Sequence, residues 1–312
     1  MTLSLCAALC LVAAPRPTVW MMPPGGEGGR CWRELFEHPE QWAETRARVD
    51  YLGAADHVLH RQYTDAELGA WLPKLGEWGL KLGLEVGAVK EWATTGQKCF
   101  DLERVAWDRF QHLGGPIGAV AFDEPLCCVR QHLKKPDSYA VDETAAFIAL
   151  VRSHYPQIKV GDIEPYPYLS VADLTGWIDA LQAKLATMGV RGLDFFRVDV
   201  DWLNFVVGRA GSWREVRRIE DACRARKLPF SLIYWAANYP MLKSKGLADD
   251  STWYVSTMGM AQDYVAVGGR PDEVVIESWV GAPSHSVPET ESWTFTRSVL
   301  DLCRTFVPGV RP

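Results

Sequence analysis

Apolar residues form short runs that recur along the chain, and most runs end in a carboxylate or an aromatic residue. Seven runs end in this way, and an eighth at residues 18–22 opens the series. The seven lie at 56–60, 82–85, 119–125, 160–165, 195–202, 232–235 and 274–279. Continuous apolar runs are typical of buried parallel strands, and acids at their common edge usually mark an active site. The pattern predicts eight strands, one about every 36 residues.

Helical patterns fall between these runs. Residues 172–188 and 290–303 carry apolar side chains three and four positions apart. Capping boxes or close variants at Thr64, Ser170, Ser212 and Ser286 predict where four helices begin. Strand and helix therefore alternate to the end of the chain. We expect one α/β domain, a (β/α)8 TIM barrel over residues 15–312, with a long loop at 91–100.

Composition agrees with a globular barrel and limits the partners. The chain has 312 residues, of which 48% are hydrophobic and 23% charged. A barrel of roughly 250 residues with loops accounts for nearly all of it. The net charge is −6, and no cluster of Lys and Arg is present. These features argue against nucleic acid and an anionic membrane as main partners.

The first fourteen residues have the apolar character of a signal peptide. The apolar stretch stops before Pro15 and is too short to span a bilayer. The expected Lys or Arg before the apolar stretch is missing, so a misassigned start or a strand-like tail is the alternative. We expect export, and hence a secreted or periplasmic protein with no membrane contact after cleavage.

Six cysteines would remain after cleavage. Export would allow disulfides, and Cys99 with Cys127 or Cys128 is the first pairing to test because these residues follow predicted strand ends. Buried thiols are the alternative.

Glu124 and Glu277 follow the fourth and eighth apolar runs. Cleavage of a glycosidic bond needs one carboxyl group to protonate the leaving oxygen and a second to attack the sugar or activate water, at a separation of about 5–9 Å. Strands four and eight face each other across a barrel mouth. We therefore expect Glu124 to act as general acid and Glu277 as nucleophile or general base. The alternative for each is a buried acid satisfied by Arg or backbone donors.

The sequence Phe122-Asp123-Glu124-Pro125 resembles the end of strand four in the retaining glycoside hydrolase barrels of clan A. In that family an Asn-Glu-Pro sequence carries the acid/base, and here Asp123 replaces the asparagine. Ile276-Glu277-Ser278-Trp279 is similar to the nucleophile motif of the family. The family places its nucleophile on strand seven, whereas Glu277 follows the eighth run. The resemblance covers the barrel plan and these two motifs, and it implies a glycosidase.

Further polar and aromatic residues at strand ends are candidates for substrate binding. Side chains alternate along a strand, so Asp162 and Glu164 share one face, as do Arg197, Asp199 and Asp201. An ion pair between Arg197 and Asp199 would be structural, and Lys90 would neutralise an acidic mouth. Flat aromatic faces suit sugar rings, although any one Trp can be a core residue. The predicted set is His60, Glu85, Lys90, Trp92, Asp123, Asp162, Glu164, Tyr166, Asp199, Asp201, Trp202, Trp235 and Trp279.

These observations favour a carbohydrate-active hydrolase that needs no metal and no cofactor. One alternative is a sugar isomerase or epimerase with a divalent metal held by Glu164, Asp199 or Asp201, and Glu277. Another is a noncatalytic carbohydrate-binding barrel, which would keep the aromatic residues without an acid pair. In each case the partner is a carbohydrate. The sugar, the linkage and the oligomeric state are left open.

Overall fold

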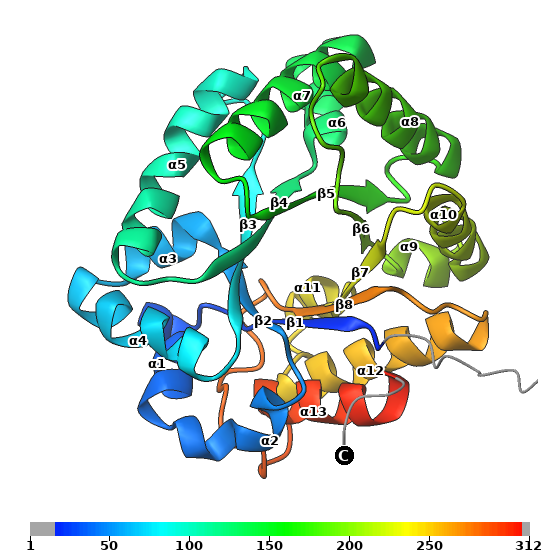
Figure 1. The fold of residues 1–312 in the computed structure, drawn as a ribbon. Coiled ribbons are helices and arrows are strands. Elements are labelled where there is room, and N and C mark those ends of the chain that lie inside the picture. The colour runs from blue at the N-terminus through cyan, green and yellow to red at the C-terminus, as the bar shows by residue number, and fades with distance from the viewer. Residues whose placement is uncertain (1–15, 308–312) are drawn as a thin grey trace, which may run out of the picture.

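The structure, a computed structural model, describes residues 16–307 and has eight parallel strands in a closed barrel (Figure 1). Each strand pairs with the next along the chain, and the last pairs with the first. This confirms the predicted (β/α)8 barrel. The strands are β1 (Thr18–Met22), β2 (Tyr51–Ala55), β3 (Lys81–Gly87), β4 (Ile117–Asp123), β5 (Lys159–Tyr166), β6 (Phe195–Val200), β7 (Phe230–Tyr234) and β8 (Glu273–Glu277).

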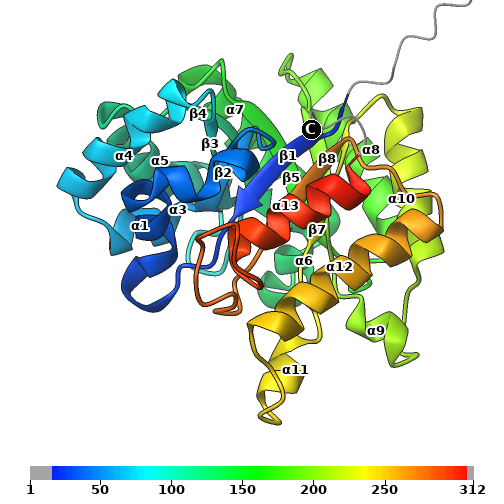
Figure 2. The ribbon, with the colours of Figure 1, turned by 90° about the horizontal axis from the view of Figure 1, so that it is seen from below.

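Helices surround the strands (Figure 1). The larger ones are α1 (Arg30–Glu37), α4 (Asp65–Glu77), α5 (Gly96–His112), α7 (Asp137–His154), α8 (Val171–Thr187), α10 (Trp213–Ala225), α12 (Asp250–Ala266) and α13 (Phe295–Phe306). Shorter ones are α2 (Ala43–Arg46), α3 (Asp56–Gln62), α6 (Pro125–Cys128), α9 (Leu203–Val206) and α11 (Tyr239–Lys243). Figure 2 shows α9 and α11, which follow β6 and β7, extending beyond the barrel.

Seven of the eight predicted strands are found with small shifts of their ends, but the prediction for the second is wrong. Residues 56–60 belong to helix α3, and β2 precedes them at Tyr51–Ala55. The small residues of β2 hide the strand from a search for apolar runs. Packing requires Gly53, because a side chain there would meet Met22 of β1, just as one at Gly83 of β3 would meet Trp20.

Three of the four predicted helix starts are confirmed. Thr64 and Ser170 form capping boxes at α4 and α8, and Ser212 caps α10. The start at Ser286 is wrong, since Thr294 caps the last helix, α13. Glu289 instead accepts hydrogen bonds from the backbone of α2, at Glu44 and Thr45. The capping-box sequence that begins at Ser286 thus stabilises α2, which is distant in the chain, and does not begin a helix of its own.

Two apolar layers hold the barrel together. The larger lies between strands and helices. The smaller fills the barrel interior and is made by Trp20, Met22, Tyr51, Ala119, Ala121, Ile163, Phe195, Ile233, Trp235, Ala237 and Val275. These inward residues alternate with outward ones, so the inner cluster tells which acids at the strand ends face the barrel axis.

Of the two possibilities for the cysteines, the structure shows buried thiols and no disulfide among the described residues. All six cysteines in the described part of the chain are free and buried. The Cys99 thiol donates to the Ala93 carbonyl and accepts from the Val89 amide, and Cys128 lies against Glu91. The thiols are therefore engaged with local partners.

The predicted signal peptide lies outside the described residues. Within residues 16–307, no helix is both long and apolar enough to cross a membrane.

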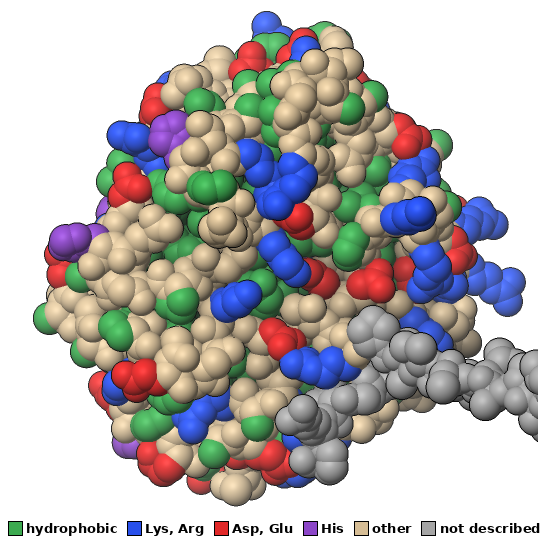
Figure 3. Space-filling model, in the orientation of Figure 1, with side chains coloured by type: hydrophobic (Ala, Val, Ile, Leu, Met, Phe, Trp, Pro, Cys, Tyr) green, Lys and Arg blue, Asp and Glu red, His purple; other side chains and the backbone are tan. Residues whose placement is uncertain are grey.

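On the face shown in Figure 3, acidic and basic side chains are interspersed and form no extended patch of one sign.

Candidate active site

Acidic side chains surround a small cavity at the carboxyl end of the barrel. The cavity measures about 220 Å³ and is lined by Glu85, Asp123, Ile163, Asp199, Ile233 and Trp279. Glu277 ends β8 on the same inward face as Val275, which belongs to the inner cluster. The structure thus brings acids from β3, β4, β6 and β8 to one mouth, where barrel enzymes place their chemistry.

Glu124 follows β4 at the edge of this mouth. Its backbone is left-handed, with φ 49°, and it precedes the first turn of α6. The Glu124 amide donates to the Ile163 carbonyl at 2.8 Å, which holds this bend. Burial, and then the neighbouring Asp123, raise the pKa of Glu124 to about 7, against the opposing effect of Lys90. A half-buried carboxyl that titrates near neutrality is suited to proton donation.

Lys90 neutralises one of the mouth acids, as predicted. It lies in the loop after β3, is 8% exposed, and its Nζ contacts the Asp123 carboxylate at 2.8 Å. Burial lowers the pKa of Lys90, but Asp123 reverses this effect and the net shift is upward. Lys90 therefore stays charged.

Arg197 lies at the centre of the barrel below the acids. Its guanidinium stacks 4.2 Å from the ring centre of Trp20, and its Nε donates to the Ser231 hydroxyl at 2.9 Å. Its ion pair is with Glu273 at 3.5 Å. The predicted pair of Arg197 with Asp199 is thus wrong: Arg197 instead pairs with an acid at the opposite end of β8.

Two buried carboxyl oxygens near the mouth, Oδ1 of Asp199 and Oε2 of Glu277, have no hydrogen-bond partner among residues 16–307. Both Nη atoms of Arg197, below them, also lack a hydrogen bond, although Nη2 lies 3.5 Å from Glu273 in the ion pair. Buried polar groups are normally paired, so such a group calls for an explanation. Here the two carboxyl oxygens lie at the same end of the barrel.

The inner acids also have raised pKa values. Burial is the main cause in each case. Burial, and then Asp123, raise the pKa of Glu85 to about 8. The pKa values of Asp199 and Glu277 lie well above the ordinary range. Glu124 raises the pKa of both Glu85 and Asp199, and these two raise that of Glu277. Glu85 and Asp199 thus link the two predicted catalytic residues electrostatically.

Three tryptophans form one wall of the mouth. The rings of Trp235 and Trp279 lie 4.3 Å apart at 36°, and Trp279 is 50% exposed. Trp235 donates to the Val200 carbonyl, and Trp202 donates to the Trp235 carbonyl. These bonds fix an aromatic surface with an open outer face. Asp201 lies beside it, held by the Asn204 amide at 2.8 Å.

Three predicted binding residues face away from the mouth. Asp162, Glu164 and Tyr166 are on the outer side of β5, beneath the helices. Asp162 accepts from the Trp177 indole, Glu164 from the amides of Leu126 and Cys127, and the Tyr166 hydroxyl donates to Glu215. Their contacts are structural. Glu164 nevertheless supports the site, because it holds the first turn of α6 directly after Glu124.

Two more predicted residues lie apart from the cavity. His60 is on α3, where its carbonyl accepts from Arg109 of α5. Trp92 is 61% exposed in the loop after β3. The site also contains residues that the sequence analysis missed, namely Ile163 and Ile233 in the cavity wall and Ser231 and Glu273 around Arg197. Alternation along β5 places Ile163 on the face opposite to Asp162 and Glu164. The register of Ile163 with Arg197 on β6 shows that this face is the inner one.

The metal alternative requires acids that the fold separates. Glu164 faces outward, whereas Asp199 and Glu277 face inward. Among the described residues, no group of three or more His, Cys, Asp or Glu side chains is arranged to hold a metal ion. The predicted metal-ligand set is therefore not assembled.

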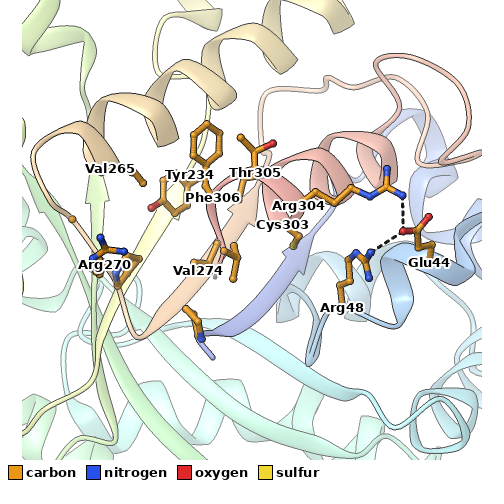
Figure 4. A pocket seen from close by; sticks show the side chains of 15 residues that line it. Glu44, Arg48, Tyr234, Val265, Arg270, Val274, Cys303, Arg304, Thr305 and Phe306 are labelled. Atoms are coloured by element: carbon orange, nitrogen blue, oxygen red, sulfur yellow. Dashed lines mark hydrogen bonds and ion pairs between the residues drawn. The ribbon is translucent and has the colours of Figure 1, made fainter. Parts of the chain in front are cut away.

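A larger cavity of about 650 Å³ lies at the other end of the barrel, where α12 and α13 end and β8 begins. Its wall is mainly apolar, with Val265, Val274 and Phe306 (Figure 4). Two of its arginines, Arg48 and Arg304, share the Glu44 carboxylate. The inner acids are at the opposite end, so this cavity does not belong to the candidate site.

Fold and site together define a (β/α)8 barrel with an acidic, aromatic-walled mouth. No family model and no curated protein matches the chain. Several solved structures share its fold. A glucosidase from Croceicoccus marinus has a TM-score of 0.52 at 14% identity, over 93% of this chain and 67% of that one. Xylanase10C from Cellvibrio japonicus has a TM-score of 0.53 at 10% identity, over 97% and 68%.

The YdjI aldolase from Escherichia coli K12 is about as similar, with a TM-score of 0.51 at 9% identity over 95% of this chain and 92% of that one. Glycosidases and an aldolase thus match equally well. At these identities the likeness shows the barrel fold, and function has to be argued from the site.

Proposed function

We propose that this chain is a carbohydrate-active hydrolase that cleaves glycosidic bonds, with Glu124 as general acid and Glu277 as nucleophile or general base. The observation that carries the proposal is the state of Glu124. It is half-buried at the edge of the acidic cavity, and its pKa of about 7 keeps a proton available near neutral pH. Glycosidases need such a carboxyl group to protonate the leaving oxygen.

The second carboxyl group has to act as an anion. Burial raises the pKa of Glu277, and the neighbouring Glu85 and Asp199 raise it further. Arg197 opposes these effects, because its buried positive charge lowers the pKa of Glu277. Arg197 would thereby stabilise the ionised form that attacks the sugar or activates water. It would act on Glu277 and need not touch the substrate.

The aromatic wall supports a sugar as the substrate. The exposed face of Trp279, backed by Trp235, offers a flat apolar surface next to the acids. Sugar rings combine apolar faces with hydroxyls at their edges, so stacking and hydrogen bonding occur together in such a site. The charged state of Lys90 weighs against an aldolase that uses this lysine as an amine nucleophile, since a protonated amine cannot attack a carbonyl.

The test is a panel of chromogenic glycosides and polysaccharides assayed with the wild type, Glu124→Gln and Glu277→Gln. We expect activity in the wild type and a loss of roughly 10²- to 10⁴-fold in each variant. Asp263→Asn, a matched amide substitution on the exposed side of α12, is the control and should remain active. Near-normal activity of either glutamine variant would refute the pair. Sugar binding without turnover of any glycoside would favour the noncatalytic barrel.

A further inference from the structure

The inner acids outnumber the cations available to them. Lys90 is paired with Asp123, and Arg197 with Glu273. In the part of the chain that the structure describes, no Lys or Arg nitrogen lies within ion-pair distance of Glu85, Glu124, Asp199 or Glu277, although Arg197 acts on Glu85 and Glu277 from further away. The site therefore has negative charge, or protons in its place, that the protein itself does not balance.

An independent observation points to a ligand. The Glu277 side chain is only 6% exposed, yet its Oε2 has no hydrogen-bond partner within residues 16–307. It belongs to the inward face of β8, below Trp279 of the cavity wall. Oδ1 of Asp199, which lines the same cavity, is also without a partner. Leaving a buried carboxyl oxygen unpaired costs free energy. A ligand that donates hydrogen bonds to these two oxygens would recover it.

We propose that the cavity binds an amino sugar, with the protonated amine of the sugar placed among Glu85, Asp199 and Glu277. The proposal rests on the proposed function and names its substrate class. An ammonium group has three donors and no acceptor, which matches a site that presents carboxyl oxygens and no free cation. The sugar ring would lie against Trp279. Binding would draw protons from the acids, because a nearby positive charge favours their ionised form.

The size of the cavity limits what enters it. Sites for drug-sized ligands measure roughly 300–1,000 Å³. The cavity at the mouth, at about 220 Å³, is smaller. It therefore suits one sugar residue, while further residues of a longer chain would lie outside it.

The competing possibility is a neutral sugar. Acids that hold their protons can donate to hydroxyl groups, and such a site would not distinguish an amino sugar from its parent. The two possibilities differ in the ligand that binds more tightly, so a direct comparison separates them.

The experiment measures binding to the full chain through tryptophan fluorescence, since Trp279 and Trp235 lie in the mouth. The probes are glucosamine, galactosamine and mannosamine, each compared with its parent hexose and its N-acetyl form at pH 7. At least one amine should bind tenfold or more tightly than both comparisons. Equal or weaker binding of all the amines, or no saturable signal with any of them, would overturn the proposal.

Variants then place the amine. Asp199→Asn and Glu85→Gln should each reduce the preference for the amine at least tenfold, and the Asp263→Asn control should keep it. The melting temperature of each variant shows that it is folded, and two separate acids are tested in case one variant is not. An unchanged preference in both folded variants would also overturn the proposal.

The outcome is distinguishable from that of the proposed function. Binding requires no hydrolysis, so the Glu124→Gln variant should keep the preference for the amine. If amino sugars bind but no glycoside is cleaved, the hydrolase proposal fails and the amino-sugar site stands. If glycosides are cleaved and no amine is preferred, the amino-sugar proposal fails alone.

Discussion

Buried acids on the two faces of the barrel strands differ in their partners. On the outer face of β5, Oδ2 of Asp162 accepts from the Trp177 indole although its Oδ1 has no partner, and Glu164 accepts from two backbone amides at 2.6 and 3.2 Å. On the inner face, Asp199 and Glu277 accept no side-chain or backbone hydrogen bond from residues 16–307, and each has a buried oxygen without a partner. Burial raises the pKa of all four acids.

The comparison shows that burial and a raised pKa do not identify a functional acid. The partners separate the two groups. An acid with donors stabilises the fold, because it satisfies buried N–H groups that would otherwise be unpaired. An acid without donors lowers stability, so it is retained for another reason. Each experiment below tests whether the two groups behave differently.

The largest expected difference is in turnover. Glu124→Gln should lower kcat by roughly 10²- to 10⁴-fold, because the amide cannot donate the proton. Asp162→Asn, on the outer face, should change kcat much less, since its side chain lies beneath α8. Steady-state kinetics on the best glycoside of the panel measure kcat for both variants. A similar loss in the two variants would remove the functional distinction between the faces.

The next difference is in the free energy of unfolding, and here the outer-face variant should show the larger loss. Glu164→Gln should lower the free energy of unfolding by about 1–3 kcal/mol, because the amide nitrogen cannot accept from the Leu126 or Cys127 backbone. Asp199→Asn should leave it within about 0.5 kcal/mol or raise it at neutral pH. Urea denaturation followed by tryptophan fluorescence gives both values. A greater loss in Asp199→Asn would mean that the inner acids are structural.

A third effect is expected in the pH dependence of activity. Above pH 7 the rate should fall as Glu124 loses its proton. Asp123 raises the pKa of Glu124, so Asp123→Asn should move this alkaline limb to lower pH, and loss of the negative partner of Lys90 acts in the same direction. The pH profile of kcat/KM measures the shift. A limb that stays in place would indicate that another group titrates.

A fourth effect concerns the dependence of stability on pH. The folded pKa of Glu85 is about 8, above its ordinary value of 4.5. Between these values the folded chain binds more protons than the unfolded chain, so the free energy of unfolding should fall as pH rises from about 4.5 to 8. Glu85→Gln should make this decrease shallower. Urea unfolding at pH 5 and pH 8 measures the decrease in both proteins. The same decrease in the variant as in the wild type would contradict the raised pKa of Glu85.

Much of the fold is readable from the sequence. Seven strands were predicted because their apolar runs are continuous, as buried parallel strands require. The second strand was missed because Gly53 and its neighbours are small. A side chain at Gly53 would meet Met22 on β1, and no local pattern records that constraint. The cap assigned to Ser286 failed for a related reason, since Glu289 serves α2.

The candidate site was predictable in part. Arg197 and Asp199 were placed on one face by alternation, and Lys90 near the acids by its position after β3. The partner of Arg197 was not predictable, because Glu273 comes from a strand distant in sequence and is brought near only by the register of β6, β7 and β8, in which Ser231 pairs with both residues. The same holds for Asp162 and Glu164, whose donors lie on α8 and α6.

The sequence by itself determined the barrel plan, with seven of its eight strands, and the gathering of acids at the strand ends, because both follow from periodicities within single segments. Only the tertiary structure decided which acids face the barrel axis and which of them find donors. That distinction depends on strand register, on the size of side chains across the barrel and on the ends of packed helices. These are relations between residues far apart in the chain, and they separate the acids that stabilise this protein from the acids that its mouth leaves unpaired.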